Sequence, residues 1–566
     1  MESATGIDAG LFEDYQRELE ALETFRERYR HLYPFAGLDR DDPDVQRLIE
    51  SLAFFTARTR RAGEHALAAY ERRALEQVFP HLCTPLPSMA LLTALGAERM
   101  VEARTLPAGT EVAVSPHAHG RAGTGTGEPP AVLYRTVREL VVRPFDLDRS
   151  RIEMSRLGDD GWELVVPIRS ATPRVEAVGA IELHIDPHGD LLAALRLHHA
   201  LGHHLEGVRY SFPDTRQPER PARRVAFAPA PGEADAFAGP LERFRELLHF
   251  PQGALVVRVP IEQTPAEWQR LELRFRLGPG WPRELGVPPG AFLLHAAPLI
   301  NLRRELADPA PLDGTKARLL VAHPEPALEL CPRELLGVYR SSQSGLTPLL
   351  PEALAAGDAD WYAVEISGRH TSRQVWLDVH APDAFEARAA VVVDAEWYQP
   401  SAGRLLRGPL EARLTARHLE AARWRVVTPV EDAVESPLAG RRERLGRLLA
   451  LAGQSDLDAA ALTFLLEMLG AADRELFQRV ARAIAEVTTE RQPDASSPSG
   501  MRTTMSVRLR RLPLALVPAA DLLLSRLPAL LAAWTGDEPP IVRVRLEGDE
   551  EDTVTTYRDE EATHDR

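Results

Sequence analysis

The sequence contains almost no lysine and almost no asparagine: Lys316 and Asn301 are the single examples in 566 residues. A GC-rich coding sequence explains this bias. Arginine supplies the remaining positive charge; it pairs bidentately with carboxylates and stacks on aromatic rings, which suits large protein interfaces. Cysteine is also scarce, because Cys83 and Cys331 are the only two. They cannot form a disulfide framework or a zinc site by themselves, which favours a reducing, cytosolic compartment.

The chain has no excess of positive charge. Its 83 acidic residues outnumber its 67 lysines and arginines, which gives a formal net charge of −16. General electrostatic attraction to nucleic acid or to an anionic membrane surface is therefore opposed. We expect protein partners and no nucleic-acid partner.

Targeting and membrane-spanning patterns are also missing. The first six residues, Met1 to Gly6, have neither the basic nor the apolar region of a signal peptide. The most apolar late stretch, 512–534, holds Asp521, Arg526 and three prolines, which a spanning helix would accommodate only at high cost. We expect no direct membrane insertion.

Familiar catalytic motifs do not occur. The sequence has no HExxH, GxSxG, SxxK or paired CxxC, and Lys316 lacks the upstream glycine of a phosphate-binding P-loop. The glycine-rich run at 125–127 is followed by prolines and a predicted strand instead of a helix, so it predicts a hairpin loop. The sequence therefore predicts no enzyme activity, no cofactor and no metal site.

Histidines gather in the run HHALGHH at 198–204. On a helix, His199 and His203 would share one face and could bind a transition metal. However, Gly202 favours a turn, and no Asp, Glu or Cys stands at the usual ligand spacing. We therefore expect an exposed loop, and a metal-binding enzyme built on His198–His204 is the less favoured alternative.

The N-terminal part is predicted to be a helical module. Residues 11–33 carry apolar side chains at spacings of three and four, which form a seam along one helix. Pro34 and the acidic run at 39–44 separate it from a second helix over 43–79, which Pro80 ends. The seam consists of Phe12, Tyr15, Leu19, Leu22, Phe25, Tyr29 and Leu32.

A seam of this kind must be buried against another helix. Two arrangements remain open: packing on the 43–79 helix of the same chain, and a helix bundle shared with other chains. The two arrangements are compatible with each other.

From Met89 onward, the pattern changes to short apolar and β-branched runs between glycines and prolines. Their spacing suits sandwiches or barrels better than βαβ units. The predicted strands are 90–95, 111–114, 132–134, 140–142, 162–168, 178–185, 225–227, 254–259, 271–275, 318–321, 361–366, 375–379 and 390–393.

Helical periodicity returns at 441–489, and the stretch 492–500 has the composition of a linker. A strand at 505–509, a leucine-rich helix and a strand at 541–546 are predicted to follow. Residues 547–566 hold nine acidic and two basic side chains and are expected to form a disordered tail.

The predicted fold class is α+β. It has an N-terminal long-helix module, β-rich central domains of sandwich or barrel type, a C-terminal helical segment and a small α/β end. The predicted divisions are a helical module at 1–88, a β-rich domain at 89–240, a second β-rich region at 241–430, a helical segment at 431–491, a linker with an α/β segment at 492–546, and the acidic tail at 547–566.

Several local motifs occur in a characteristic order. They are YQREL at 15–19, DPDVQRLIESLAFFTAR at 42–58, FPHL at 79–82, PLPSM at 85–89, LPAGT at 106–110, YRT at 134–136, INLRREL at 300–306 and LDGTK at 312–316. This order and spacing resembles the TssF family of type VI secretion, also called ImpG or VasA. The resemblance is specific over about residues 11–145 and 290–325.

The resemblance implies a structural subunit of the baseplate wedge. In that family two copies bind one TssG, and the subunits TssE and TssK are attached to this complex. The resulting wedges surround a spike hub protein and help to nucleate the contractile sheath. The implied location is cytoplasmic, at the baseplate docked on the inner membrane. The family is also similar to wedge proteins of contractile phage tails, so a wedge subunit of a phage-like extracellular injection particle is the alternative.

Two sets of residues follow from the seam and the resemblance together. The residues expected at the partner interface are Phe12, Tyr15, Leu19, Leu22, Phe25, Tyr29, Arg47, Leu48, Leu52 and Phe55. The motif residues expected to have structural roles are Arg17, Glu18, Pro80, Pro87, Asn301 and Lys316.

Overall fold

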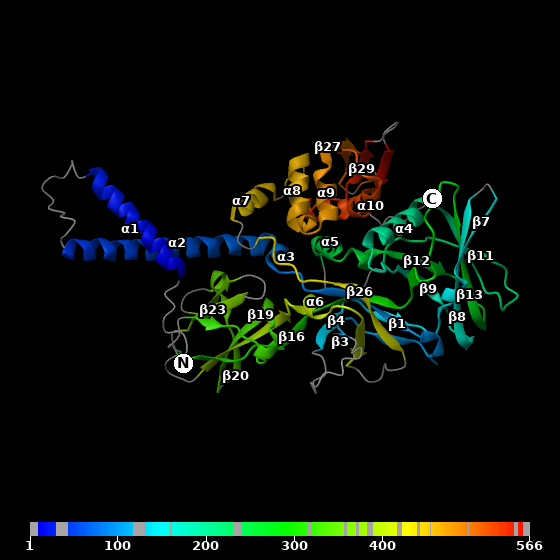
Figure 1. The fold of residues 1–566 in the computed structure, drawn as a ribbon, viewed down its shortest axis with the longest axis horizontal. Helices are drawn as coiled ribbons and strands as arrows, with labels where there is room; N and C mark the ends of the chain where they lie inside the picture. Colours follow the sequence, from blue (N-terminus) through cyan, green and yellow to red (C-terminus); the bar gives the residue numbers. More distant parts are fainter. Residues whose placement is uncertain are drawn as a thin grey trace. The chain divides into compact units, whose positions relative to one another are not determined.

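The computed structural model divides the chain into two compact units, a helical unit (residues 1–80) and a main unit (residues 81–566). Figure 1 shows the elements of both units. The described residues are 9–29, 43–116, 131–158, 161–229, 239–313, 318–343, 345–355, 359–368, 373–381, 389–415, 422–438, 442–452, 454, 456–495, 497, 499–547 and 553–558. Lys316 and the predicted glycine-rich loop at 125–127 lie outside them.

The helical unit consists of two long helices, α1 (Ala9–Tyr29) and α2 (Pro43–Val78). Both helices were predicted, and residues 30–33 of the first lie outside the described part. Pro43 begins α2, where the missing backbone N–H costs nothing, and Asp44 in the first turn complements the helix dipole. Gly63 does not interrupt α2. The short α3 (Pro80–Cys83) follows.

A closed six-stranded barrel forms the centre of the main unit. Its strands, in order around the barrel, are β1 (Met89–Leu95), β15 (Ala296–Ile300), β4 (Val132–Thr136), β3 (Glu111–Pro116), β25 (Leu410–Leu414) and β26 (Arg423–Glu431). Burial alternates along β3 and β4, as expected for strands with one face in a core. In β1, six consecutive residues are buried because its two faces contribute to two core clusters.

Further antiparallel sheets are formed by segments that lie between the barrel strands in the sequence. One has the order β11-β10-β13-β8-β6, with β7 also paired to β8; a three-stranded sheet has the order β12-β9-β14, and β2 pairs with β5. The helices α4 (Leu191–His204) and α5 (Pro240–His249) occur in this region. The strands are β2 (Arg104–Leu106), β5 (Leu140–Val142), β6 (Asp146–Leu147), β7 (Glu153–Arg156), β8 (Trp162–Arg174), β9 (Gly179–Ile185), β10 (Leu205–Ser211), β11 (Arg220–Ala222), β12 (Val256–Ile261), β13 (Trp268–Leu277) and β14 (Phe292–Leu293).

Residues 303–398 contribute two sheets that share one core. The first sheet has the order β16-β24-β19-β20, with β17 paired to β24, and the second has the order β18-β23-β22-β21. Val338 and Trp397 of the first sheet and Leu377 of the second belong to the same buried cluster, as in a sandwich. The strands are β16 (Arg303–Leu306), β17 (Ala310–Leu312), β18 (Leu319–Leu320), β19 (Cys331–Ser342), β20 (Gly345–Pro348), β21 (Leu350–Pro351), β22 (Trp361–Ser367), β23 (Gln374–His380) and β24 (Ala389–Tyr398).

The C-terminal part combines helices with a four-stranded sheet of order β27-β28-β29-β30. The parallel pair β28 and β29 is connected through two apolar helices, α10 and α11. The elements are α6 (Ala402–Leu405), α7 (Arg442–Leu451), α8 (Ala459–Leu469), α9 (Glu475–Arg482), β27 (Ile484–Pro493), β28 (Met501–Leu509), α10 (Val517–Leu524), α11 (Leu527–Thr535), β29 (Ile541–Leu546) and β30 (Thr553–Tyr557).

The predicted α+β class is confirmed, but several boundaries differ. Residues 484–489 are part of β27 instead of a helix, and the predicted linker begins inside β27, which pairs with β28 as a hairpin. At 225–227 only an isolated bridge from Ala226 to Arg258 forms. The predicted tail is not wholly disordered, because Thr553–Tyr557 pairs with β29.

The sheet pairings also cross the predicted division at residue 240. β8 pairs with β13, and β1 pairs with β15 and β26, so the segments at 89–240 and 241–430 share sheets. Domain limits drawn along the chain cannot represent a barrel whose strands come from distant segments.

Among the described residues, no single helix is both long and apolar enough to span a membrane. The bent pair 514–524 and 527–535 reaches the required length and composition only when its two helices are taken together. Leu523, Leu527 and Leu530 of this pair are buried within the main unit.

Candidate partner-binding surface

Among the described side chains, two ion pairs connect α1 to α2. Arg60 Nη1 lies 2.7 Å from Glu18 Oε1, and Arg61 Nη1 lies 3.8 Å from Asp14 Oδ2. The Glu18 side chain is only 9% exposed, so its carboxylate depends on this contact. Arg17, which was predicted to have a structural role beside Glu18, pairs with Asp14 on its own helix at 3.3 Å.

Small residues on α2 allow the two helices to approach each other. Ala53 and Ala57 are fully buried, and they lie on the same face of α2 because they are four residues apart. Leu19 and Leu22 of α1 are half-buried. The seam therefore packs within its own chain, but it is only partly covered.

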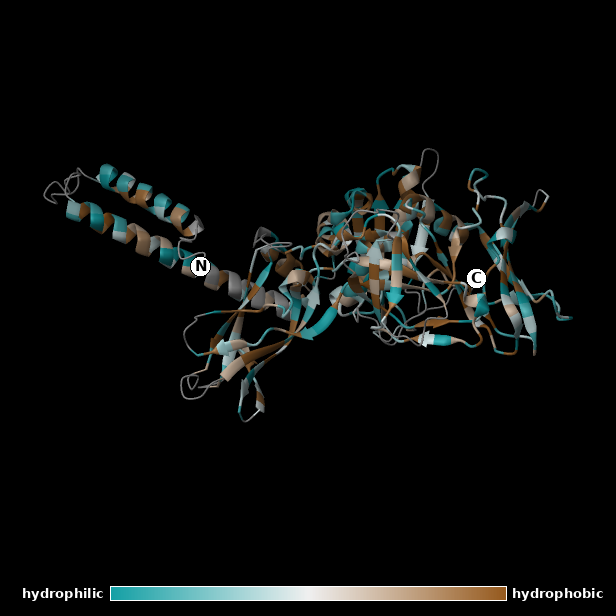
Figure 2. Ribbon diagram, turned by 60° about the horizontal axis from the view of Figure 1, so that its bottom comes forward, coloured by the Kyte–Doolittle hydropathy of each residue, from teal (hydrophilic) through white to brown (hydrophobic). Residues whose placement is uncertain are grey.

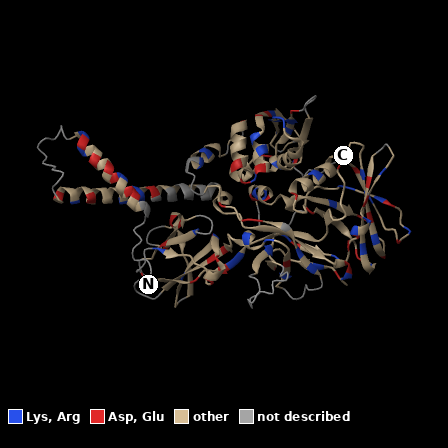
Figure 3. Ribbon diagram, in the orientation of Figure 1, with Lys and Arg blue, Asp and Glu red and all other residues tan. Residues whose placement is uncertain are grey.

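Large apolar side chains remain exposed on this helical unit. Leu48 is 69% exposed, Phe55 62% and Tyr70 70%. Hydrophobic positions recur along both helices in Figure 2, while acidic and basic residues recur along α1 in Figure 3. The exposed set comprises Phe12, Phe25, Leu48, Leu52, Phe54, Phe55, Leu67 and Tyr70.

This set divides the predicted interface residues into two groups. Phe12, Phe25, Leu48, Leu52 and Phe55 are exposed, and Arg47 is exposed beside Asp44. Tyr15, Leu19, Leu22 and Tyr29 are half-buried. Phe54, Leu67 and Tyr70 share the exposure of the first group although they were not predicted as interface residues; their apolar character within a long polar helix is the signal that could have identified them.

Some exposed rings are already in contact with a neighbour. The ring centroids of Phe25 and Tyr29 are 4.5 Å apart, and those of Phe54 and Phe55 are 6.1 Å apart. Side chains restricted by such contacts lose less rotamer entropy when a partner binds. The described surface of the helical unit thus has the composition expected of a contact site for other helices.

Three further motif residues, Pro80, Pro87 and Asn301, have structural positions. Pro80 begins α3, and the Pro87 carbonyl accepts a hydrogen bond from His249 Nε2 at 2.9 Å. Asn301 is 1% exposed; its Nδ2 donates to the Leu133 carbonyl at 2.7 Å, and its Oδ1 accepts from the Gln399 N–H at 2.6 Å.

Arg245 on α5 is a buried cation that sequence analysis missed. Its guanidinium donates to the carbonyl oxygens of His81 and Thr84, at the end of α3. Burial lowers the pKa of Arg245 to about 10. Nothing in the local sequence distinguishes this arginine from its many exposed counterparts.

The histidine run 198–204 lies on α4, so the predicted exposed loop is wrong. Asp190 caps this helix, because its Oδ1 accepts from the Ala193 N–H at 3.0 Å, and Gly202 continues the helix. His198 is directed into the main unit against Phe227, and burial lowers its pKa to about 4. Burial also lowers the pKa of His204, whose ring lies edge-on to Trp281.

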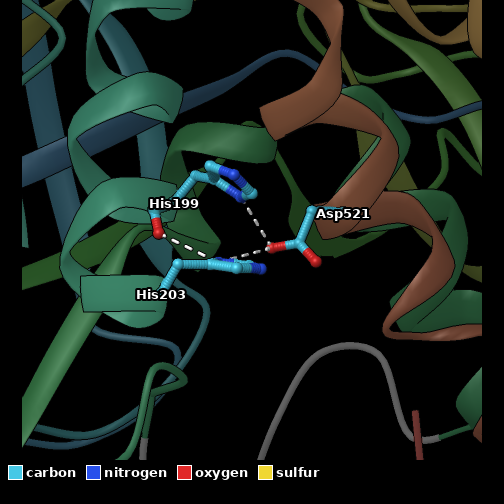
Figure 4. Close-up of side chains that lie close together, drawn as sticks. All are labelled: His199, His203 and Asp521. Atoms are coloured by element: carbon cyan, nitrogen blue, oxygen red, sulfur yellow. Dashed lines mark hydrogen bonds and ion pairs between the residues drawn. The ribbon is translucent and has the colours of Figure 1, made fainter. Parts of the chain in front are cut away.

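The other two histidines meet a carboxylate from a distant helix. His199 Nδ1 lies 3.0 Å from Asp521 Oδ2, and His203 Nδ1 lies 3.9 Å from the same oxygen (Figure 4). Burial of Asp521 raises its pKa, but hydrogen bonds from His199 and Tyr557 outweigh this effect and leave the pKa below its usual value.

Much of the sequence is similar to one known protein family. The family model described as "Type VI secretion system, TssF" matches residues 7–334, more than half of the chain. The chain belongs to the TssF family. Among curated proteins, none matches it.

Two solved structures show the same fold. One is a chain from the type VI secretion TssK-TssF-TssG baseplate subcomplex solved by cryo-electron microscopy, with a TM-score of 0.69 and 19% identity, covering 91% of this chain and 98% of that chain. The other is from the type VI secretion baseplate complex, with a TM-score of 0.55 and 18% identity, covering 96% and 98%. A TssF-family fold therefore extends over nearly the whole chain, including the part beyond residue 334.

Proposed function

We propose that this chain is a structural subunit of a type VI secretion baseplate wedge and that its helical unit binds a TssG-like subunit. The observation that carries this proposal is the exposed apolar set on α1 and α2, in a chain of the TssF family. The solved baseplate subcomplex with the same fold contains TssG and TssK beside TssF, which supports these two partners.

The finer arrangement follows the family. Two copies of the chain bind one TssG-like subunit, and TssE-like and TssK-like subunits attach to this complex. The resulting wedges surround the spike hub and help to nucleate the sheath. The complex is located at the cytoplasmic side of the inner membrane. We expect no catalytic activity and no cofactor.

The exposed apolar side chains of α1 and α2 explain why these helices would form a bundle with helices of a partner subunit. A third or fourth helix could cover Leu48, Leu52 and Phe55, which lie at spacings of four and three on α2. Fully burying one such side chain stabilises the contact by about 1.5–3 kcal/mol. Several residues together would give a stable complex despite the loss of translational freedom.

The substitution Phe55→Asp tests the proposal. Phe55 is largely exposed in the single chain, so the variant should fold with unchanged circular dichroism. In the complex the carboxylate would be buried without a partner, and we expect the affinity for a TssG-like subunit to fall about a hundredfold. Unchanged affinity of a folded variant would exclude α2 from the interface.

Val175→Asp is the matched control. Val175 is an apolar residue of the main unit that is 77% exposed, so it undergoes the same chemical change outside the helical unit. We expect it to bind the partner like the wild type.

The mass of the co-expressed complex tests the stoichiometry, for which we expect two copies of this chain and one TssG-like subunit.

A further inference from the structure

Three metal-binding side chains converge between α4 and α10, within the main unit. His199 and His203 are one helical turn apart on α4, and Asp521 of α10 is 322 residues away from His199 in the sequence. Figure 4 shows both imidazoles directed toward the same carboxylate. The sequence lacks a carboxylate near the histidines, but the fold supplies one.

The distances suit a small divalent ion. One ligand atom from each of the three residues lies within 4.8 Å of the other two. Zinc–ligand bonds of about 2.0–2.2 Å place the ligands of a tetrahedral site about 3.3 Å from each other. His199 Nδ1 and Asp521 Oδ2 are already 3.0 Å apart.

His203 requires only a small adjustment. Its Nδ1 is 3.9 Å from Asp521 Oδ2 and 3.1 Å from the His199 carbonyl, with which it makes a hydrogen bond within the helix. The two imidazole centroids are 4.0 Å apart. Rotation of the His203 side chain would exchange this hydrogen bond for a metal ligand without moving α4.

A tyrosine positions the carboxylate. The Tyr557 hydroxyl on β30 donates a hydrogen bond to Asp521 Oδ1, and Asp521 Oδ2 faces the histidines. In many carboxylates that bind metals, one oxygen is a ligand and the other accepts a hydrogen bond. This hydrogen bond fixes the orientation of the carboxylate. This contact also links the carboxylate to the last described strand.

Solvent can reach the three side chains. The side chains of His199, His203 and Asp521 are 22%, 42% and 24% exposed. An ion therefore has a path to them, and water can complete its coordination. Two imidazoles with one carboxylate favour zinc and similar transition ions over calcium or magnesium, which prefer oxygen ligands.

We propose that His199, His203 and Asp521 form a structural site for a zinc-class divalent ion that fastens the C-terminal helices to α4. The ion would connect α10 directly to α4, and Tyr557 would extend the link to β30. This site is separate from the helical unit, so its test does not depend on partner binding through α1 and α2.

The test is zinc binding by the untagged, full-length chain. After dialysis against a micromolar zinc buffer, we expect about one zinc per chain by elemental analysis, and added zinc should raise the melting temperature. His203→Ala should lose the bound zinc and its stabilising effect. His203 is the most exposed of the three ligands, so this variant should still fold.

Two further variants sharpen the result. His204→Ala changes the neighbouring histidine outside the cluster and should keep both zinc and the stabilisation. Tyr557→Phe keeps all three ligands and should bind zinc about tenfold more weakly, because the carboxylate loses its orienting hydrogen bond. Cobalt provides a second readout: its visible absorption should appear with the wild type and not with His203→Ala.

Adventitious binding gives a different pattern. If His203→Ala binds as much zinc as the wild type, or if zinc leaves the wild-type melting temperature unchanged, the proposal is wrong. Equal loss of zinc from His203→Ala and His204→Ala would also contradict it, because the ion would then be held by the histidine run and not by the cluster with Asp521.

Discussion

Asn301 shows how a single residue connects distant parts of the main unit. It is the only asparagine in the chain, and its amide joins the Leu133 carbonyl of β4 to the Gln399 N–H that follows β24. Its own N–H donates to the Ser88 carbonyl at 2.9 Å, just before β1. The amide group of Asn301 suits this position, because its NH₂ donates one hydrogen bond while its oxygen accepts the other.

We therefore predict that Asn301→Ala destabilises the main unit. The substitution leaves the Leu133 carbonyl and the Gln399 N–H without their side-chain partner in a buried place, at a cost of about 2–4 kcal/mol in unfolding free energy. Chemical denaturation measures this cost. Gln217→Ala at an exposed position serves as the control, and equal stability of the two variants would contradict the assigned role.

Buried histidines make the main unit sensitive to acid. Burial lowers the pKa of His249 to about 4, and the nearby Arg474 acts in the same direction, while Glu431 and the hydrogen bond to the Pro87 carbonyl oppose them. In the unfolded chain the pKa of histidine is about 6.5. The unfolded state therefore binds the proton more tightly, and stability falls as the pH falls from about 6.5 toward 4.

The predicted contribution of His249 is about 1 kcal/mol of stability lost between pH 7.5 and pH 5.5. His249→Gln can still donate to the Pro87 carbonyl but does not titrate, so its stability should fall less steeply over this range. Denaturation at several pH values measures the slope. The same substitution at half-exposed His188 controls for the loss of a histidine, and a wild-type slope in His249→Gln would refute the assignment.

Among the elements, the two N-terminal helices are held together in part by the ion pair between Arg60 and Glu18. Glu18 is nearly covered and Arg60 is half-exposed, so the pair contributes about 1–2 kcal/mol to the packing of α1 on α2. We predict that Glu18→Arg loosens α1, because two cations would then face each other.

Hydrogen exchange over residues 9–29 measures this loosening. Exchange should be faster in Glu18→Arg and slower again in the double variant Glu18→Arg with Arg60→Glu, which restores opposite charges. If the double variant exchanges as fast as the single one, the ion pair does not hold the helices together.

Local patterns predicted part of the strands and the long helices, because each pattern reflects local physics, but they missed the barrel strands β15, β25 and β26. The spacing of apolar residues predicted α1 and α2, and short β-like runs between glycines and prolines predicted β3 and β4. The glycine at 202 led to the wrong structure for α4, although Asp190 before the run of leucines is a clear N-cap signal. The spacing of apolar residues at 484–489 fits a helix, but these residues form a strand because they pair with β28.

The candidate sites depended more on tertiary structure. The apolar residues of α2 could be predicted from sequence, but which of them remain exposed depends on how α1 covers them. The contact between His199 and Asp521 could not be predicted, because it joins residues 322 positions apart. Arg245 was missed for the same reason: the carbonyl groups that it binds are far away in the sequence.

At the scale of the whole molecule, the two units differ in how their apolar residues are buried. The main unit closes its barrel with strands from both ends of the region 89–431 and buries large aromatic side chains such as Trp397 and Phe275. The helical unit leaves large aromatic and aliphatic residues in solvent. This contrast supports the proposal that helices of a partner subunit complete the helical unit.

Hydrogen exchange of the full chain, alone and bound to a TssG-like subunit, tests this claim most directly. We expect binding to slow exchange over α1 and α2, most strongly around the exposed residues Leu48 to Phe55 of α2. Unchanged exchange in both helices, with protection confined to the main unit of the complex, would contradict it.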